Sequence, residues 1–177
     1  MTLAELLSQK KSIIVERWID LLFSSYPAET TRFLKKEKDR FDNPVAYQIT
    51  QGITGLYEAL LQERDSEQVL GYLDEIIRIR AIQEFSPSQA MAFIFLLKKV
   101  IRGELATELQ EPQIAAECLE LESRIDGLAL LGFEVYMKRR EKLHEIRINE
   151  VKNRISGYMR KAGLTLIYPD KDTDLKH

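Results

Sequence analysis

Residues 86–101 decide the fold class, and their sequence reads SPSQAMAFIFLLKKVI. The segment begins with a capping box, in which Ser86 is the N-cap, Pro87 takes the first helical position and Gln89 follows three residues after the cap. Apolar side chains then occupy nearly every face of the helix from Ala90 to Ile101. A helix with so little polar surface is buried on several sides, so we expect it at the centre of the fold or in an interface.

The chain before this stretch predicts further helices separated by prolines and capping residues. Apolar side chains over residues 3–25 largely follow the 3.6-residue period of an amphipathic helix, which Pro27 ends. Residues 29–36 predict two more helical turns. A charged loop follows, and the next helix begins after it.

Two more helices are expected before the capping box. Asn43-Pro44 supplies an N-cap followed by a proline at the first helical position, and the helix it opens runs to about Arg64. Asp65 or Ser66 caps the next helix, which ends near Gln83.

Pro112 opens the last helical region, which we expect to continue to Ala162 with Gly163 just beyond its end. An apolar stripe marks its first half, and the charged run at 138–142 interrupts this stripe. A narrower stripe with the spacing of a coiled-coil seam follows. We refer to its residues as the seam: Ile148, Val151, Ile155 and Tyr158.

The sequence is expected to form three parts: a helical domain over residues 1–137, a projecting basic helix over 138–163 and a flexible tail over 164–177. The first part has 15 basic and 22 acidic residues, whereas residues 138–161 have nine basic and three acidic ones. The net charge of the chain is only −2, so no global field points to nucleic acid or to an anionic membrane. The basic helix fits a solvated helix with i,i+4 ion pairs, or contact with an acidic partner or nucleic acid.

Composition places the chain among globular helical proteins. It has 177 residues, of which 45% are hydrophobic and 31% are charged, with only 8 glycines and 5 prolines. Its single cysteine, Cys118, cannot form a disulfide within the chain, which favours a reducing compartment. The N-terminus lacks the charge order of a signal peptide, and the longest uncharged apolar stretch, residues 85–97, is too short to span a membrane. We therefore expect a cytoplasmic protein that is not inserted in a membrane.

Motifs for nucleotide binding, zinc ligation and hydrolysis are missing from the sequence. It contains no Walker loop and no GxGxxG, HExxH or CxxC pattern. Of its two histidines, His144 lies among charged neighbours, where a surface role is expected, and His177 is the last residue. We therefore expect no enzymatic activity, no metal site and no cofactor.

Arg80 is less ordinary, because it shares the apolar face of its helix with Leu73 and Ile76. A guanidinium there requires an acidic or carbonyl partner, since an unpaired buried charge costs several kcal/mol. The acidic candidates are Asp39, Asp42 and Glu84. The arginine fits a structural salt bridge, or alternatively contact with an anion or signal ligand.

Two other side chains have structural interpretations. Trp18 lies on an apolar face, so we expect it in the core. Arg78 follows Asp74 by four residues on the other face of the helix, and an i,i+4 surface pair is expected.

Three blocks of the sequence occur in a distinctive order. They are Trp18 with Tyr26-Pro27, then Asp39-Arg40-Phe41-Asp42-Asn43-Pro44, then residues 76–90 with the sequence IIRIRAIQEFSPSQA, which FIFLLKKVIR at 93–102 extends. In order and spacing they resemble the N-terminal domain of RsbT co-antagonist proteins of the RsbRD type, over residues 1–105.

That resemblance implies a bacterial helical sensor domain, regarded as related to haem-free globins, which dimerises and signals to an output domain through a C-terminal linker helix. We thus expect an all-α, globin-like or related bundle of about six helices with a long projecting C-terminal helix. Haem is not expected, because residues 1–137 contain no histidine. No phosphorylatable STAS domain follows in the sequence, so we expect a stand-alone domain whose output function belongs to a separate protein partner.

The expected function is that of a non-enzymatic sensory or regulatory module. Two alternatives stay open: a structural adaptor whose basic helix docks on a larger complex, such as a respiratory one, and nucleic-acid binding through residues 138–161. The expected site lies where the loop before Asn43 meets the turn at Phe85, and such a junction can hold an anion or small molecule. Its residues are Arg40, Asn43, Arg80, Gln83 and Ser86. The seam and the apolar surplus of residues 90–101 predict a homodimer with parallel helices.

Overall fold

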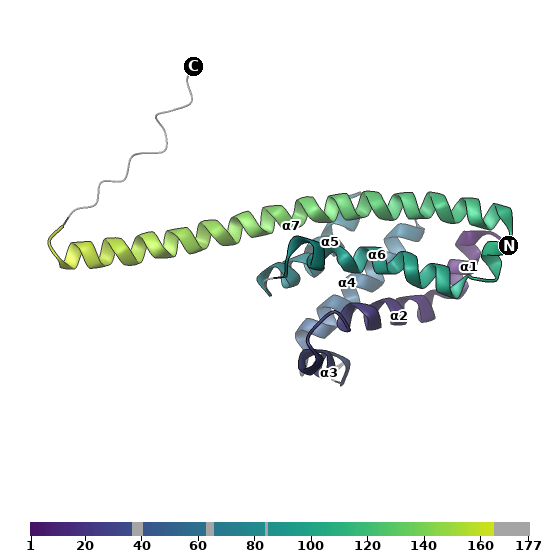
Figure 1. Ribbon diagram of the computed structural model, residues 1–177, viewed down its shortest axis with the longest axis horizontal. Coiled ribbons are helices and arrows are strands. Elements are labelled where there is room, and N and C mark those ends of the chain that lie inside the picture. Colours follow the sequence, from purple (N-terminus) through teal and green to yellow (C-terminus); the bar gives the residue numbers. More distant parts are fainter. Residues whose placement is uncertain (37–40, 63–65, 84, 165–177) are drawn as a thin grey trace, which may run out of the picture. The chain divides into compact units, whose positions relative to one another are not determined.

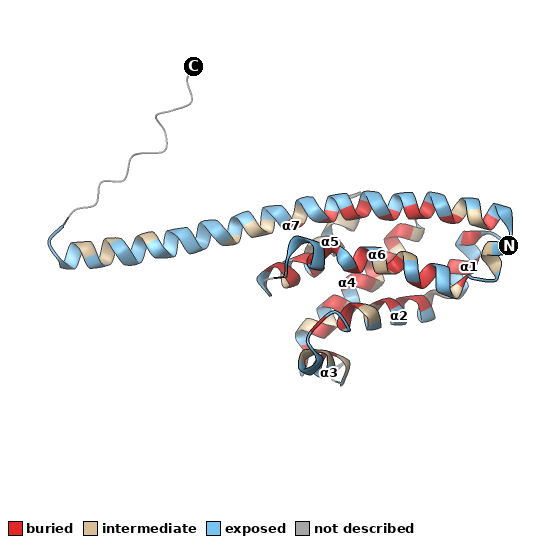
Figure 2. Cartoon of the chain, in the orientation of Figure 1, coloured by how far each residue is buried: buried red, intermediate tan, exposed pale blue. Residues whose placement is uncertain are grey.

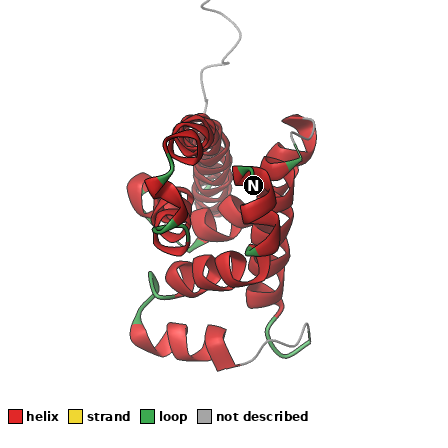
Figure 3. Ribbon diagram, turned by 90° about the vertical axis from the view of Figure 1, so that its right-hand side faces the viewer, coloured by secondary structure: helices red, strands yellow, loops and turns green. Residues whose placement is uncertain are grey.

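The structure, a computed structural model (Figure 1), describes residues 1–36, 41–62, 66–83 and 85–164. These residues contain helices and no strand, as Figure 3 shows, so the all-α prediction is confirmed. They form seven α-helices and one short 3-10 helix, η1 (Glu108–Gln110), where the sequence predicts about six helices. The long C-terminal helix is confirmed as α7 (Pro112–Lys161).

The chain divides into two compact units, Met1–Arg139 and Arg140–His177. The first unit contains helices α1 to α6 and the first half of α7, and the second unit begins within α7. Most of the expected tail, residues 165–177, lies outside the described residues. Within the described residues, no helix combines the length and the hydrophobicity that a membrane crossing requires.

The N-terminal segment forms two helices, α1 (Leu3–Gln9) and α2 (Lys11–Phe23), where the sequence predicts a single one over residues 3–25. Lys10 separates them, with φ −92° and ψ 9°. Its ammonium donates to the carbonyl oxygen of Glu104 at 2.6 Å, far along the chain. Each of the two helices buries an apolar face of its own. Apolar residues therefore recur at helical spacing on both sides of Lys10, and the sequence gives no sign of the break.

Capping residues define the starts of the middle helices. These helices are α3 (Ala28–Lys36), α4 (Pro44–Leu61), α5 (Ser66–Ile82) and α6 (Pro87–Glu104). Asn43 caps α4 by accepting the N–H of Ala46 at 3.0 Å. Ser86 accepts the N–H of Gln89 at 3.3 Å, and the Gln89 side chain accepts the N–H of Ser86 at 3.1 Å. The expected capping box is therefore confirmed.

Glycines allow α4 and α5 to approach each other closely. A Cβ atom at Gly52 would lie 2.8 Å from Cγ1 of Ile76, and one at Gly55 would overlap the ring of Tyr72. Any larger side chain at these positions would push the two helices or these two side chains apart.

Helix α6 mixes buried and exposed residues (Figure 2), and its seven buried residues account for only part of its nearly continuous apolar sequence. Its Phe93 packs on Trp18 of α2 with ring centroids 6.3 Å apart, and the indole Nε1 donates to the Phe93 carbonyl oxygen at 2.6 Å. Trp18 is a core side chain, as its position predicts, with none of its surface exposed. Phe95, on the same helix, is 48% exposed.

The buried side chains of α7 lie between Ile114 and Tyr136, along its first half. The helix ends at Lys161, one residue before the predicted Ala162, and Gly163 terminates it as predicted, with a φ of 69° and with the N–H of Leu164 donating to the carbonyl oxygen of Met159 at 2.9 Å. This arrangement is a Schellman motif, in which glycine adopts the left-handed conformation at no steric cost.

Candidate functional site

The candidate site is built around Arg80, a fully buried residue on α5. Leu73, Ile76 and Ile77 of the same helix are also fully buried, so the guanidinium lies on the apolar face, where the sequence placed it. Nη2 donates to the carbonyl oxygen of Gln89 at 2.9 Å. That bond supplies the carbonyl partner that a buried guanidinium requires.

The remaining donors of Arg80 are poorly satisfied. Nη2 also approaches Oγ of Ser25 at 3.2 Å, whereas Nε and Nη1 have no hydrogen-bond partner in the described part of the chain. Of the expected acidic partners, Asp42 is exposed and forms no bond with Arg80, and Asp39 and Glu84 lie outside the described residues. Buried polar groups without partners are uncommon in native proteins, and each is a reason to look for a functional role, stored strain or a bound water or ion.

Aromatic rings surround the guanidinium in place of a carboxylate. Its Cζ lies 4.2 Å from the ring centroid of Phe85, 5.2 Å from that of Tyr26 and 6.0 Å from that of Phe93. Tyr26 and Phe85 meet edge to face at 5.1 Å. The closest contact, with Phe85, is of the kind that stabilises a desolvated cation by about 2 kcal/mol. We call Arg80, Tyr26, Phe85 and Phe93 the arginine cluster.

Burial shifts the pKa values of the two ionisable groups in the cluster. Desolvation lowers the pKa of Arg80, and the neighbouring Tyr26 opposes this effect. Desolvation likewise raises the pKa of Tyr26, while Arg80 opposes it. Both groups keep their ordinary protonation at neutral pH, so the cluster holds one buried positive charge.

Three of the five residues predicted for this site belong to the cluster's surroundings. Gln83 accepts the Tyr26 hydroxyl at 2.9 Å, and Ser86 forms the capping box with Gln89, whose carbonyl oxygen binds Arg80. Tyr26 and Phe85 were not predicted for this site, although both stand in the sequence blocks that carry the family resemblance.

The other two predicted residues are not placed in the cluster. Asn43 is buried and donates to the carbonyl oxygen of Phe33 at 3.3 Å while it caps α4. Its amide is thereby used within its own helix start and the preceding segment. Arg40 lies outside the described residues.

The cluster is bonded directly to the first half of α7. The hydroxyl of Tyr136, which is 1% exposed, donates to the carbonyl oxygen of Phe85 at 2.6 Å. One turn further, Arg139 forms a two-point ion pair with Asp74 of α5, with Nε 2.6 Å from Oδ1. The expected surface pair between Asp74 and Arg78 is therefore wrong, because the carboxylate faces α7 and takes Arg139 instead.

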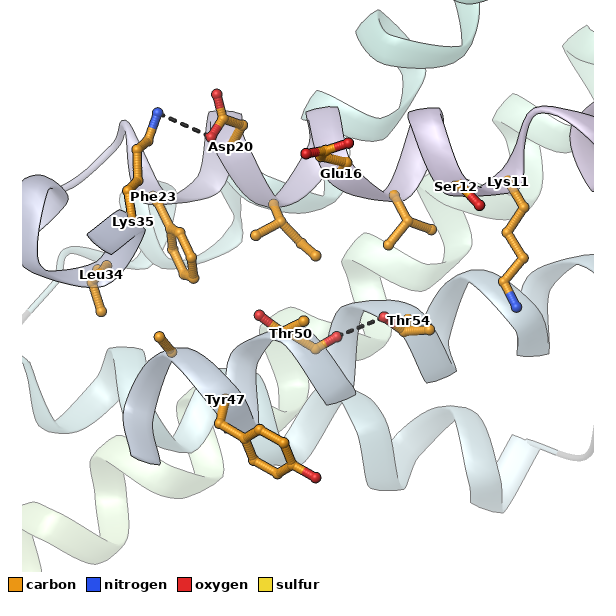
Figure 4. A pocket seen from close by; sticks show the side chains of 13 residues that line it. Lys11, Ser12, Glu16, Asp20, Phe23, Leu34, Lys35, Tyr47, Thr50 and Thr54 are labelled. Atoms are coloured by element: carbon orange, nitrogen blue, oxygen red, sulfur yellow. Dashed lines mark hydrogen bonds and ion pairs between the residues drawn. The ribbon is translucent and has the colours of Figure 1, made fainter. Parts of the chain in front are cut away.

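A separate cavity of about 440 Å³ lies between α2 and α4, next to α3 (Figure 4). Its wall is formed by apolar side chains from all three helices: Val15, Ile19, Phe23, Leu34 and Ala46. The charged residues at its rim include Lys35, which pairs with Asp20 at 3.1 Å, and Lys11, which pairs with Glu58. We call this cavity the α2–α4 pocket.

The remaining side chains that could react or bind a metal show no sign of a site in the structure. His144 is exposed on α7, and Cys118 is a buried free thiol whose pKa is raised mainly by burial. Among the described residues, no group of three His, Cys, Asp or Glu side chains is close enough to hold a metal ion. The seam residues are exposed on α7, from 44% for Ile155 to 72% for Tyr158.

A comparison with known families matches residues 13–151 to the RsbT co-antagonist protein rsbRD N-terminal domain. The matched range includes every residue of the arginine cluster, the whole α2–α4 pocket except Lys11 and Ser12, and α7 as far as Val151. No curated protein and no solved structure matches the chain.

Proposed function

Because the chain belongs to the family of the RsbT co-antagonist protein rsbRD N-terminal domain, we propose that it is a regulatory module of a signalling pathway. It has no catalytic role. It receives a signal in the unit Met1–Arg139 and passes the signal through α7 to a separate protein that carries the output. Its free, buried cysteine supports a cytoplasmic location.

The observation that carries this proposal is the hydrogen bond between Tyr136 of α7 and the carbonyl oxygen of Phe85. The ring of Phe85 covers the guanidinium of Arg80, whose Nε and Nη1 have no partner in the described structure. A group with unsatisfied donors gains by moving to a better-bonded arrangement, and any such movement displaces Phe85. Tyr136 then transmits the displacement to α7.

A pair of tyrosine substitutions tests this route. Tyr136→Phe removes the bond to Phe85, and Tyr57→Phe alters an equally buried tyrosine, whose hydroxyl donates to the carbonyl oxygen of Leu7 at 3.0 Å. Each variant should lose about 1–3 kcal/mol of stability, because a buried carbonyl loses its donor. Only the first variant interrupts the connection to α7.

The partner is first captured from the native cell with the full chain and identified by mass spectrometry, and its affinity is then measured with purified proteins. We expect Tyr136→Phe to change this affinity and Tyr57→Phe to leave it unchanged. Equal effects of the two variants would reduce Tyr136 to a structural role and would contradict the proposed route.

We also propose that the protein is a homodimer in which the seams of two chains meet. Exposure supports this arrangement, because the apolar seam residues are uncovered in the single chain. Most of the apolar side chains at 90–101 are already buried within the chain, so α6 supports a dimer less than the sequence suggests.

In sedimentation at tens of micromolar, Ile155→Glu should dissociate the dimer. Ile146→Glu alters a similarly exposed residue off the seam and should not.

A structural adaptor is a second candidate, favoured by an apolar groove between α6 and the first half of α7. The groove has a volume of about 600 Å³, and its side chains Phe95, Leu130 and Phe133 are 48%, 75% and 47% exposed. Exposed apolar patches of this kind mark protein interaction sites. An adaptor would bind its partner equally well with or without Tyr136→Phe. Nucleic-acid binding through residues 138–161 would instead show an affinity that falls steeply with salt.

A further inference from the structure

We propose that the α2–α4 pocket binds a small, neutral, elongated molecule with an apolar body and one oxygen that forms a hydrogen bond with Thr50. This inference rests on the proposed regulatory function and identifies the chemical class of its input. The volume of about 440 Å³ lies within the range of ordinary small-molecule sites, about 300–1,000 Å³. Five apolar side chains line it together with polar ones, so the apolar part of a ligand gains free energy by leaving water against them.

The charges around the pocket exclude a charged ligand. Lys35 is paired with Asp20 and also donates to Oγ of Ser24 at 3.2 Å, and Lys11 is paired with Glu58. An anion entering the pocket would therefore have to displace an existing carboxylate from its lysine. A cation would lose its hydration against the apolar wall, and Glu16, the lining carboxylate without an ion pair among the described residues, is exposed to water and so offers it little compensation.

The polar contact comes from the hydroxyl of Thr50, which points from α4 into the space facing α2 (Figure 4). It forms no hydrogen bond within the described part of the chain. The neighbouring Thr54 differs, because its hydroxyl donates to the carbonyl oxygen of Thr50 at 2.8 Å. Thr50 thus provides one free donor and acceptor in an apolar slot, which suits a hydroxyl or carbonyl group on the ligand.

The end of α2 connects the pocket to the arginine cluster. Phe23 lines the pocket, and the hydroxyl of Thr31 bonds to the carbonyl oxygens of both Phe23 and Tyr26, at 2.9 and 3.0 Å. Tyr26 is a member of the cluster, and the intervening Ser25 contacts Arg80. A ligand against Phe23 therefore acts on a short, hydrogen-bonded segment that ends at the guanidinium.

Three probes that share a six-carbon chain test the ligand class: 1-hexanol, hexanoate and hexylammonium. Their binding to the full-length protein is measured by isothermal titration calorimetry. We expect 1-hexanol to bind, and the two charged probes to bind at least tenfold more weakly. Equal binding of all three would show an unspecific apolar cavity, and no binding of 1-hexanol would show that the pocket is not a site; both outcomes overturn the proposal.

Variants of the pocket locate the bound probe. Thr50→Val keeps the shape and should weaken 1-hexanol binding by about tenfold, which corresponds to one hydrogen bond. Thr54→Val is the matched control, because its hydroxyl is already bonded within α4, and it should bind like the wild type. Ala46→Leu should abolish binding by filling the space, with circular dichroism confirming that it folds. Binding that survives in Ala46→Leu would place the probe elsewhere and overturn the assignment.

Amide hydrogen exchange separates this inference from the proposed function. Saturation with 1-hexanol should change exchange rates at residues 24–26 and 85–93, next to the arginine cluster. If 1-hexanol binds but these rates stay constant, the pocket is not the input, and the route through Tyr136 is unaffected. If the rates change and Tyr136→Phe has no effect on the partner, the pocket stands and the proposed route fails.

Discussion

Replacing Arg80 by methionine should change the stability of the domain only slightly, although Arg80 is among its most deeply buried side chains. The substitution removes a charged hydrogen bond to Gln89 and the cation–π contact with Phe85, worth about 1.5–3 and about 2 kcal/mol. It also removes the cost of burying a guanidinium, which is several kcal/mol. The two unpartnered donors, Nε and Nη1, are part of that cost.

The losses and gains are of similar size, and a methionine sulfur packs well against aromatic rings. We therefore expect Arg80→Met to change the free energy of unfolding by less than about 2 kcal/mol. Arg80→Lys is the control, because it keeps the buried charge without the planar group that stacks on Phe85, and it should cost about 3 kcal/mol or more. Urea unfolding followed by circular dichroism measures both variants.

The proposed regulatory function makes a second prediction for Arg80→Met, which concerns its effect on the partner protein. It should lose its effect on the partner while it remains folded, since no unsatisfied charge is left to move. A methionine variant less stable than the lysine variant would refute the reasoning, because it would show that the guanidinium is a net stabilising strut. A stable methionine variant that still regulates the partner would remove Arg80 from the signalling route.

Three further predictions concern the rest of the domain. Gly55→Ala should destabilise the protein by about 1–3 kcal/mol through overpacking, whereas Gly71→Ala, where a Cβ would meet open space, should stabilise it by up to about 1 kcal/mol in urea titrations. Cys118 should react with a thiol reagent at neutral pH only after unfolding, because it is buried and its pKa is raised; rapid labelling of the native protein would contradict this. Hydrogen bonds from Arg102 lower the pKa of Glu122 below 4.5. The stability this pair contributes is therefore present above pH 4.5 and is lost as the pH falls through the folded-state pKa, so Glu122→Gln should flatten the acid limb of the stability profile.

Helix boundaries were predictable wherever a local signal fixes them. Asn43 and Ser86 cap their helices with their own side chains, and Gly163 adopts the backbone conformation that ends α7. Such signals depend only on residues within one turn, so a single sequence contains them. The apolar sequence of α6 predicted its buried face, but it did not predict that the helix also has an exposed side, on which Phe95 is 48% exposed.

Features that depend on distant partners were not predictable. The break at Lys10 is accompanied by a hydrogen bond to Glu104, and Asp74 takes Arg139 in preference to the nearer Arg78. Periodicity identifies the face on which a side chain lies and not the residue that it meets.

The candidate site shows the same limit. The apolar face of α5 located Arg80 correctly, and of the two kinds of partner expected, a carboxylate or a carbonyl group, the structure supplies the carbonyl oxygen of Gln89. The aromatic rings around the guanidinium were not predicted. Tyr26 and Phe85 carry no charge pattern that would have pointed to this role.

The packing of Trp18 gives the protein a built-in optical probe. It is the single tryptophan of the sequence, so the indole emission of the native protein comes from one known position. Its ring stacks on Phe93, whose ring centroid lies 6.0 Å from Cζ of Arg80, and it shares α2 with Val15 and the other side chains of that helix that line the pocket. Its fluorescence should therefore respond to changes at the guanidinium and to a molecule entering beside α2, in a protein that carries no attached dye.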